Sequence, residues 1–289
     1  EGKAGRRGLR VCDLAYPDRV ASLVEAGVER ARRRAASLGG EIPGDVSALV
    51  DAALAAGERL RELATDTGLE IVESLRDGKR VLLEGAQGTA LDLDHGTYPF
   101  VTSSSTTAGG ASTGSGIGPT VIDAVMGVVK AYTTRVGNGP LPTAFEPDMD
   151  EKLRELGGEF GATTGRPRRC GWFDAVLARY AARVNGLTGL AVTKLDVLDT
   201  LPELRIVTAY RMQDGSVTRD FPADTWSLAH VEPVFETLPG WEESTQDVRR
   251  LEDLPANARG YLDRIVELTG APAQWVSVGT KRRQIIPVV

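Results

Sequence analysis

The sequence predicts an α/β fold with a mainly parallel central sheet flanked by helices and a small antiparallel portion near the C-terminus. Helical and extended patterns alternate along most of the chain, which is typical of α/β proteins. Short apolar runs, such as Leu190 to Val192, have the length and composition of buried parallel strands. Beyond residue 200, extended segments follow one another with Asp-Gly and proline-containing turns between them, which accounts for the antiparallel portion.

The first 79 residues are predicted to be mostly helical. From Pro17 to about Leu38, apolar residues recur every three or four positions with Arg and Glu between them, so we expect an amphipathic helix. A second helical pattern covers about Asp45 to Leu75. Their charged faces fit solvated surface better than a binding site. We expect residues 1–79 to form this helical segment and residues 80–289 to form the ligand-binding α/β part of the same domain.

Strand and helix patterns alternate in the second part. The predicted helices cover about Thr120 to Thr133, Phe173 to Val184 and Asn257 to Leu268. The predicted strands cover Arg80 to Leu83, Leu190 to Val192, Arg205 to Arg211, Ser216 to Phe221, Val231 to Leu238 and Gln274 to Val278.

The composition excludes several classes of protein. The 289 residues are 42% hydrophobic and carry a net charge of −6, which fits a globular protein and argues against broad nucleic-acid binding, since that requires a basic surface. No apolar stretch approaches the roughly 18 residues of a transmembrane helix, so we expect no membrane partner. Cys12 and Cys170 are far apart and predict neither a disulfide framework nor a thiolate metal site, so we expect a cytoplasmic location.

Glycine is concentrated between residues 81 and 171, which hold 16 of the 33 glycines. Such density allows positive φ angles and close approach of the backbone to a ligand, although ordinary turns also use glycine. Gln87, flanked by glycines, carries the donor and the acceptor that recognition of a purine edge requires, or lies solvated in a tight turn. The hydroxyl-rich run from Thr102 to Thr107 suits a phosphate seat, or a polar turn.

The segment from Gly161 to Arg169 combines two threonines with three arginines in four positions. In an extended loop Arg166 and Arg168 point to one side, and each can grip a carboxylate or phosphate through two parallel N–H bonds. A basic loop paired with surface acids is the alternative. Because solubility does not require three arginines in four positions of an acidic chain, an anion-binding loop is favoured.

The tetrapeptide Thr193-Lys194-Leu195-Asp196 directly follows a predicted strand. A carboxylate at Asp196 can accept two hydrogen bonds from guanine, one from the ring N–H and one from the exocyclic amine, whereas adenine offers no such pair. The stem of Lys194 can cover the face of the base. A surface lysine followed by a helix-capping aspartate would produce the same tetrapeptide.

His95 stands between carboxylate-bearing and glycine residues, at Asp92-Leu93-Asp94-His95-Gly96. The only other histidine is His230, so no His-rich metal site can be built. We expect His95 to make structural hydrogen bonds rather than to act directly in catalysis.

The chain closely resembles adenylosuccinate synthetase in five sequence signatures. In order along the chain they are E-G-A-Q-G-T, D-H-G-T-Y-P, T-S-S-S-T-T-A-G-G, G-A-T-T-G-R-P-R-R and T-K-L-D-V-L-D. The resemblance runs from Arg6 almost to the C-terminus, and five signatures in order are far more specific than one. It implies a P-loop-NTPase-like α/β fold and a homodimeric carbon–nitrogen ligase of purine and AMP biosynthesis. Such an enzyme joins L-aspartate to IMP with GTP and Mg²⁺, through a 6-phosphoryl-IMP intermediate.

The resemblance also implies roles for individual residues. Gln87 would contact the purine of IMP and Thr102 its phosphate, while Arg6 would cross the dimer interface to the partner's IMP phosphate. Arg166 would contact the ribose region and aspartate, and Arg168 would reach aspartate and the transferring phosphoryl group. Gln87 and Arg168 would be the catalytic residues of this chain. The aspartate site would further include Ala162, Thr163, Thr164 and Gly165, and the guanine nucleotide site Lys194, Leu195, Asp196, Ser277, Val278 and Gly279.

The chain departs from the family's pattern in what it lacks. It has neither the G-D-E-G-K-G loop, which supplies the general base, a Mg²⁺ ligand and the phosphate cradle, nor the downstream acid histidine. It starts at Glu1 without a methionine, so we expect an N-terminally truncated form that does not turn over alone, with the metal ligands mainly in the absent segment. After Gly279, Thr280-Lys281 replaces the usual proline and acid.

Two other functions stay open from the sequence. One is a relative that uses a different purine or amine donor, since Thr164 and Arg166 recognise a carboxylate without identifying its side chain. The other is a non-catalytic nucleotide-binding protein.

Overall fold

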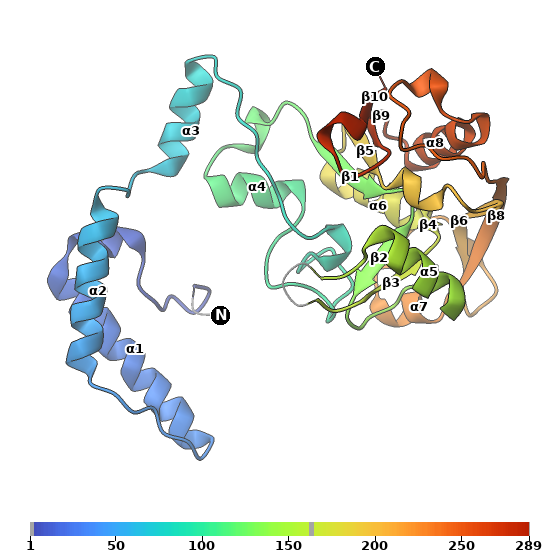
Figure 1. Ribbon diagram of the computed structural model, residues 1–289. Helices are drawn as coiled ribbons and strands as arrows, with labels where there is room; N and C mark the ends of the chain where they lie inside the picture. Colours follow the sequence, from blue (N-terminus) through green and yellow to red (C-terminus); the bar gives the residue numbers. More distant parts are fainter. Residues whose placement is uncertain (1–2, 162–164, 289) are drawn as a thin grey trace. The chain divides into compact units, whose positions relative to one another are not determined.

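The computed structural model describes residues 3–161 and 165–288. The chain divides into two compact units, of which the first ends at Arg80 and the second starts at Val81 (Figure 1).

The first unit is helical. Its elements are a 3₁₀ helix at Val11–Ala15 and the helices α1 Pro17–Ser37, α2 Val46–Arg61 and α3 Thr67–Arg76. α1 packs against α2 (Figure 1), and Gly57 allows α2 to approach Leu14 closely. The predicted helix from Pro17 is therefore confirmed, but the predicted single helix from Asp45 is wrong. It is broken at residues 62–66, where the carboxylate of Asp66 accepts a hydrogen bond from the Leu69 N–H and starts a new helix.

The central sheet of the second unit has the strand order β1-β5-β9-β10. Its strands are β1 Met126–Lys130, β5 Gly189–Thr193, β9 Ala273–Ser277 and β10 Ile285–Pro287. The first three are parallel, and β10 is antiparallel to β9. In this register Lys130 lies opposite Thr193 and Val192 opposite Val276, so the carboxyl ends of the parallel strands share one edge of the sheet.

Two smaller sheets complete the strands of this unit. β2 Thr133–Val136 pairs antiparallel with β3 Arg168–Gly171. β6 Glu203–Arg211 pairs with β4 Phe173–Asp174 in parallel and with β7 Val217–Thr218 and β8 Glu232–Pro239 in antiparallel orientation. The predicted α/β fold with its antiparallel portion is confirmed.

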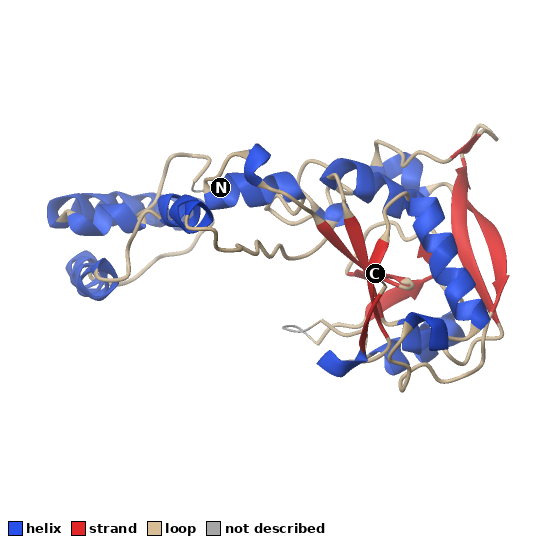
Figure 2. Ribbon diagram, turned by 90° about the horizontal axis from the view of Figure 1, so that it is seen from above, coloured by secondary structure: helices blue, strands red, loops and turns tan. Residues whose placement is uncertain are grey.

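Helices cover the sheets of this unit, as Figure 2 shows. They are α4 Ala108–Ser115, α5 Pro147–Gly157, α6 Ala175–Asn185, α7 Thr225–Ala229 and α8 Ala256–Thr269. α6 and α8 pack against each other and against the β6–β8 pair. None of the helices in the described part of the chain combines the length and the apolar composition needed to cross a bilayer.

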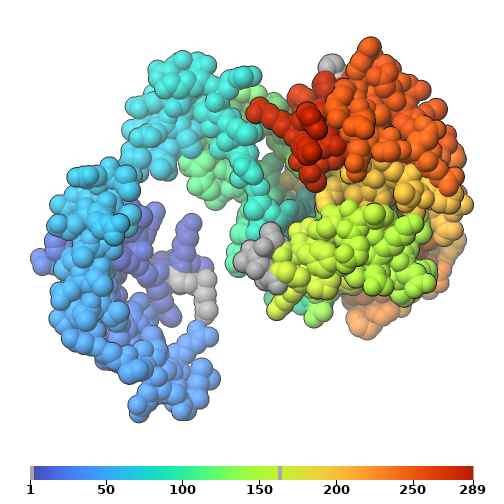
Figure 3. Space-filling model, viewed as in Figure 1, coloured from blue at the N-terminus to red at the C-terminus, as the bar shows by residue number. Residues whose placement is uncertain are grey.

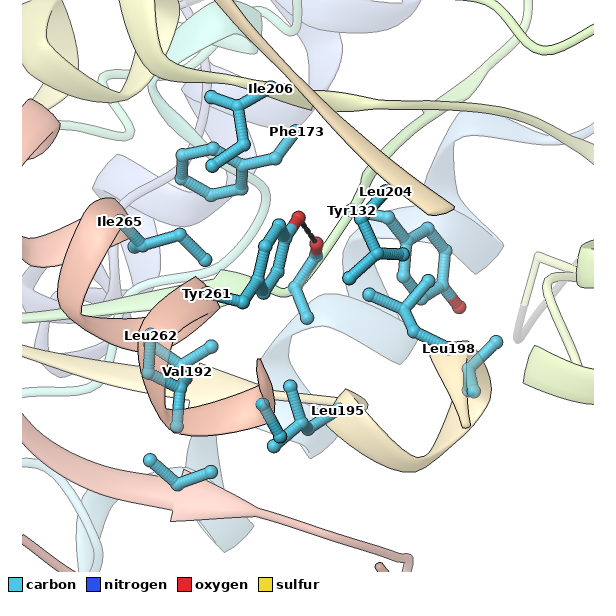
Figure 4. Close-up of a cluster of buried hydrophobic side chains, with 14 of the residues drawn as sticks. Tyr132, Phe173, Val192, Leu195, Leu198, Leu204, Ile206, Tyr261, Leu262 and Ile265 are labelled. Atoms are coloured by element: carbon cyan, nitrogen blue, oxygen red, sulfur yellow. Dashed lines mark hydrogen bonds between the residues drawn. The ribbon is translucent and has the colours of Figure 1, made fainter. Parts of the chain in front are cut away.

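The core lies where α8 meets β5 and β6. Figure 4 shows Tyr261 and Ile265 of α8 among Val192, Leu204 and other buried side chains. The Tyr261 hydroxyl donates to the Ala131 carbonyl at 2.6 Å, so this buried ring brings no unsatisfied polar group into the core. This packing fixes the residues that directly follow β1 and β5.

Three predictions in the second unit are wrong. Residues 120–133 do not form a helix, because Val128 and Val129 belong to strand β1, which pairs with β5. Gly127 of this strand packs closely against Leu187, since an added Cβ would collide with that side chain. Arg80 to Leu83 is not a buried strand, since Leu82 is 91% exposed and lacks a sheet partner among the described residues. The strand expected at Ser216 to Phe221 contains only Val217–Thr218. The elements α4, α5, α7, β2, β3, β4 and β10 were not predicted.

Candidate active site

The carboxyl ends of the parallel strands bring several predicted site residues together. β1 ends at Lys130, β5 leads from Thr193 into Lys194, and β9 ends at Ser277. Ligands of open α/β sheets bind outside this edge, because loops that leave neighbouring strands there surround a common crevice. A hollow of about 400 Å³ lies along β5, β9 and β10 and reaches this edge at Thr193 and Ser277.

The turn after β5 holds the predicted guanine-binding residues. Lys194 adopts a left-handed conformation with φ of 61°, and a 3₁₀ helix follows at Leu195–Leu198. Leu195 is fully buried and anchors the turn. Burial raises the pKa of Asp196, an effect that a hydrogen bond from the Gln246 side chain partly offsets. A carboxylate kept partly from water can still accept strong hydrogen bonds from a base edge.

The segment after β9 lies beside that turn. The Ser277 hydroxyl donates to the Gly279 carbonyl at 2.8 Å, and Val278 is buried. A Cβ on Gly279 would meet the side-chain amide of Gln284, which would have to move to make room for it. Contacts between β9 and the 195–198 turn place the two predicted parts of the guanine site next to each other.

The arginine-rich loop joins α5 to β3. Its base is closed by the Arg168 N–H, which donates to the Glu159 carbonyl at 2.9 Å, and by the Gly161 N–H, which donates to the Arg166 carbonyl at 2.8 Å. Gly165 has φ of 63°, and Arg166 is exposed. The predicted aspartate residues Ala162, Thr163 and Thr164 lie outside the described residues.

The three arginines of this loop do not share one environment. Arg169 donates to the carbonyls of Gly137 and Gly139 at 2.9 and 2.7 Å, which ties it to the loop after β2. Arg168 instead forms an ion pair with Glu159. Arg169 thus has a structural partner of its own, while Arg168 belongs to the site.

Glu159 is the centre of a cluster of cations. Its Oε2 is 2.7 Å from both the Lys130 Nζ and the Arg168 NH1, and its Oε1 is 3.2 Å from the Lys194 Nζ. The Tyr132 hydroxyl donates to Oε1 at 2.6 Å. Because three cations surround one carboxylate, the cluster carries a net charge of +2, which suits a phosphate-bearing ligand.

The cluster spans the boundary between core and solvent. The side chain of Glu159 is 0% exposed, whereas those of Lys130, Arg168 and Lys194 are 24%, 27% and 32% exposed. Burial alone would raise the pKa of Glu159, but the hydrogen bonds from Lys130, Tyr132 and Arg168 outweigh it and lower this pKa to about 2. Glu159 is therefore ionised at neutral pH.

Two of the predicted IMP residues, Gln87 and Thr102, lie in a second loop system. Gln87 is exposed with φ of 63°. The Thr102 N–H donates to the Leu91 carbonyl at 2.8 Å, and its hydroxyl is 3.3 Å from that of Ser104. Arg135 of β2 donates to the Phe100 carbonyl at 3.0 Å, and β2 pairs with β3. This chain of contacts connects the Thr102 loop to the strand that carries Arg168.

The buried carboxylate of Asp92 organises the hydroxyl-rich loop. It accepts hydrogen bonds from the backbone N–H groups of Asp94, His95, Thr106 and Thr107 at 2.6 to 3.2 Å. His95 itself is exposed, and its backbone carbonyl accepts a hydrogen bond from the Tyr180 hydroxyl at 2.9 Å.

Backbone strain coincides with predicted site residues. The described residues include four non-glycine residues with positive φ: Arg6, Gln87, Lys194 and Glu242. Three of these are predicted to bind ligand, and such strained positions are commonly found at functional sites. Arg6 is exposed in the first unit, where its NH1 donates to the Ala4 carbonyl at 2.7 Å. Gln87 makes no side-chain hydrogen bond within the described part of the chain, and it is not a member of the Glu159 cluster.

Comparison with known proteins matches the chain to the family described as adenylosuccinate synthetase over residues 1–286. The chain belongs to the adenylosuccinate synthetase family.

Relatives within this family are similar over nearly the whole chain. The adenylosuccinate synthetase of Carboxydothermus hydrogenoformans is 52% identical over 284 residues, and that of Desulforudis audaxviator is 53% identical over 294. These matches cover 98% and 99% of this chain, and the chain spans 66% of the length of each relative. The solved structure of fully ligated adenylosuccinate synthetase from Plasmodium falciparum matches with a TM-score of 0.92 and 33% identity, over 99% of this chain and 68% of that one.

The sequence patterns did not identify four residues that organise this site. They are Asp92, Lys130, Tyr132 and Glu159. Lys130 and Tyr132 lie at the end of β1 and Glu159 lies after α5, and only the tertiary structure reveals that they meet. The sequence around Asp92 contains no pattern that marks its carboxylate as a buried acceptor of backbone hydrogen bonds. One local signal existed for Glu159: an acidic residue follows Gly157-Gly158 directly before the arginine-rich loop.

Proposed function

We propose that the complete protein containing this chain joins L-aspartate to IMP, with GTP as the phosphoryl donor, and forms adenylosuccinate for AMP biosynthesis. Membership of the adenylosuccinate synthetase family supports this proposal. The structural observation that carries it is the cationic cluster of Lys130, Arg168 and Lys194 beside the carboxyl edge of the parallel sheet. A polyanionic nucleotide and a transferring phosphoryl group match both the position and the charge of this cluster.

The reaction has two steps. The purine 6-oxygen of IMP attacks the γ-phosphorus of GTP, the bond from that phosphorus to the bridging oxygen breaks, and GDP leaves. The aspartate amine then attacks C6, and the bond from C6 to the phosphorylated oxygen breaks, which releases phosphate. Arg168 stabilises charge on the phosphoryl group, since guanidinium groups in a partly dry site act strongly on developing negative charge.

Guanine recognition falls to the two adjoining segments at the strand ends. Asp196 accepts from the guanine ring N–H and exocyclic amine, the stem of Lys194 covers the base, and Leu195 anchors the turn. Ser277, Val278 and Gly279 complete the pocket. The contact between β9 and the 195–198 turn supports this assignment.

The other substrates occupy the loops described above. Gln87 contacts the purine of IMP and acts in catalysis, Thr102 contacts its phosphate, and Arg166 contacts its ribose region. Arg6 reaches the partner's IMP phosphate across a homodimer interface. Aspartate binds Arg166, Arg168 and the loop residues Ala162, Thr163, Thr164 and Gly165.

Mg²⁺ is the metal we propose for the complete protein. In the described part of this chain, no three His, Cys, Asp or Glu side chains come together as a metal site, so its residues do not fit the ion. The ligands belong to the G-D-E-G-K-G segment that the sequence does not contain. A cytoplasmic location agrees with two unpaired cysteines, Cys12 and Cys170.

The function is tested by measuring adenylosuccinate and phosphate with the full-length protein. We expect both products only when GTP, IMP and aspartate are all present, in a ratio of one to one. Product formation with another purine monophosphate or another amine in preference to IMP or aspartate would replace the proposed substrates. Absence of product from every combination, with nucleotide binding retained, would show a non-catalytic nucleotide-binding protein.

A further inference from the structure

We propose that Glu159 is a positioning residue that holds Arg168 and Lys194 in a fixed relation, so that guanine recognition and phosphoryl transfer are mechanically coupled. This inference rests on the proposed function, because it concerns the two parts of the same GTP site. Neither Glu159 nor its partner Tyr132 is needed to contact substrate.

The geometry uses both oxygens of one carboxylate for different parts of the site. Oε2 is 2.7 Å from Arg168, which lies at the base of the arginine-rich loop. Oε1 is 3.2 Å from Lys194, which opens the turn that carries Asp196. The Tyr132 hydroxyl donates to Oε1 at 2.6 Å and restrains the carboxylate from the core side. A shift of Glu159 would therefore move both cations together.

The end of α5 aims Glu159 into this position. α5 ends at Gly157, and Gly158 adopts a left-handed conformation with φ of 57°, which reverses the chain. The next residue is Glu159. A Cβ on Gly157 would collide with the Tyr132 hydroxyl, so glycine is required for the close approach. The Lys194 ammonium also donates to the Gly157 carbonyl, where the helix dipole favours a cation.

Neighbouring contacts make the support rigid. The Arg154 Nε on α5 donates to the Arg168 carbonyl at 2.9 Å, and the Asp150 Oδ1 accepts from the Cys170 N–H at 2.6 Å. These bonds tie α5 to the backbone of β3 at Arg168 and Cys170. Figure 3 shows α5, in yellow-green, at the surface of the second unit. The end of this helix thus reaches from the surface to the buried carboxylate.

The charge balance argues for positioning rather than neutralisation. A single buried carboxylate cannot cancel three cations, and the surplus stays available to the phosphates of a nucleotide. Glu159 instead fixes the orientation of the three cationic side chains. Each of them is partly exposed, and its charged group is held by an ion pair with Glu159. A loss of the carboxylate would let the long side chains adopt other rotamers, at an entropic cost to ligand binding.

The test measures kinetic parameters of full-length Glu159→Gln and Glu159→Asp proteins. Glu155→Gln is the control, because Glu155 is an exposed glutamate near the end of the same helix. For Glu159→Gln we expect kcat/KM for GTP to fall about 100-fold, as for misplacement of a catalytic group by about 1 Å, with KM for IMP within about twofold of wild type. The preference for GTP over ATP should fall as well, because Lys194 and the Asp196 turn lose their anchor.

Glu159→Asp keeps the charge and guards against misfolding of the first variant. One methylene less lengthens the ion pairs, so we expect a smaller loss in the same parameters. Unchanged GTP parameters in folded Glu159→Asp and Glu159→Gln would overturn the inference. Equal losses for GTP, ATP and IMP would also overturn it, because a merely structural residue would lower the active fraction uniformly.

A double-mutant cycle tests the coupling directly. If Glu159 acts through Arg168, then Glu159→Gln should lower kcat far less in an Arg168→Ala background than in wild type. Additive effects would contradict the proposal. Two measurements separate this inference from the proposed function. If the wild-type protein makes no adenylosuccinate, the proposed function is wrong, and calorimetric titration with GTP then tests the role of Glu159 by itself. Weaker GTP binding by Glu159→Gln would then still support the positioning role, and unchanged binding would reject it.

Discussion

The carboxylate of Asp92 accepts a hydrogen bond from the backbone N–H of Thr106 at 2.6 Å, although the two residues are fourteen positions apart. The same buried side chain accepts three further backbone N–H bonds from Asp94, His95 and Thr107. Burial alone would raise the pKa of Asp92, but these four donors hold it below its usual value. One ionised group thereby shapes the loop that contains the predicted phosphate contact Thr102.

Asp92→Asn should destabilise the second unit and weaken IMP binding. The amide can accept with only one atom, so at least two backbone donors lose a charged acceptor, at a cost of about 3 kcal/mol. We expect the melting temperature to fall by roughly 6–12 °C and KM for IMP to rise. Differential scanning calorimetry and initial rates measure these effects. Asp123→Asn, at an exposed site, should leave both unchanged; a wild-type melting temperature for Asp92→Asn would contradict the assignment.

Arg168→Ala should lower kcat more than it raises KM for IMP, because Arg168 stabilises the phosphoryl group rather than the ground state of IMP. The expected loss in kcat is about 10²–10³-fold, as for removal of one strong transition-state donor. Arg169→Ala is the control, since Arg169 bonds to the Gly137 and Gly139 carbonyls and should affect stability more than kcat. Steady-state kinetics decides, and equal kcat values for the two variants would remove Arg168 from the phosphoryl site.

Asp196→Asn should abolish the preference for GTP over ATP, since an amide cannot accept two hydrogen bonds from guanine in the same way. Binding requires the ionised carboxylate, and burial raises the pKa of Asp196. GTP affinity in the wild type should therefore fall as pH falls through this elevated pKa, and the dependence should vanish in Asp196→Asn. Asp199→Asn should instead lower stability, because that carboxylate is bonded to Trp241 and Thr245.

Calorimetric titrations across pH measure this effect for both nucleotides. A GTP preference retained by Asp196→Asn would contradict the proposed role. So would an equal loss of preference in Asp199→Asn.

The second unit should become less stable as pH rises from about 4 to 7, because the stabilisation from protonated Asp174 is lost over this range. Burial raises the pKa of Asp174 to about 6, although hydrogen bonds from the Leu177 N–H and the Tyr210 hydroxyl oppose this. The folded state therefore holds a proton that the unfolded state releases above its ordinary pKa, so the stabilisation is full at low pH and is lost as pH rises through 6.

The comparison is between denaturant unfolding of the wild type and of Asp174→Asn at several pH values. Across this range the difference in unfolding free energy should change by up to about 3 kcal/mol. Stability curves that run parallel between pH 4 and pH 7 would show that Asp174 is not protonated in the folded state.

Arg6→Ala and Arg168→Ala should complement each other if Arg6 crosses a dimer interface. Each variant alone should be nearly inactive. In an equal mixture about half of the dimers are hybrids with one complete site, so about a quarter of wild-type activity should return after subunit exchange. Initial rates before and after exchange measure this recovery. No recovery, in dimers shown to exchange subunits, would place Arg6 in its own subunit's site or outside it.

The sequence by itself determined the α/β class and the family, because the motif residues stand next to one another along the chain. Lys194 and Asp196 are two positions apart, as are Arg166 and Arg168, so their residue types and spacing already indicate a guanine site and an anion-binding loop. The apolar run from Leu190 to Val192 and the helical period from Pro17 likewise predicted their elements, since a local pattern specifies each.

The tertiary structure alone decided where β1 lies and which charges meet. Val128 and Val129 fit a helical spacing as well as a strand, and pairing with β5 chose the strand because non-local hydrogen bonds outweigh weak local propensity. Glu159, Lys130 and Tyr132 are ordinary residues in the sequence. Their importance arises from burial, which turns one carboxylate among three cations into an ionised anchor, and burial depends on segments far apart in the chain.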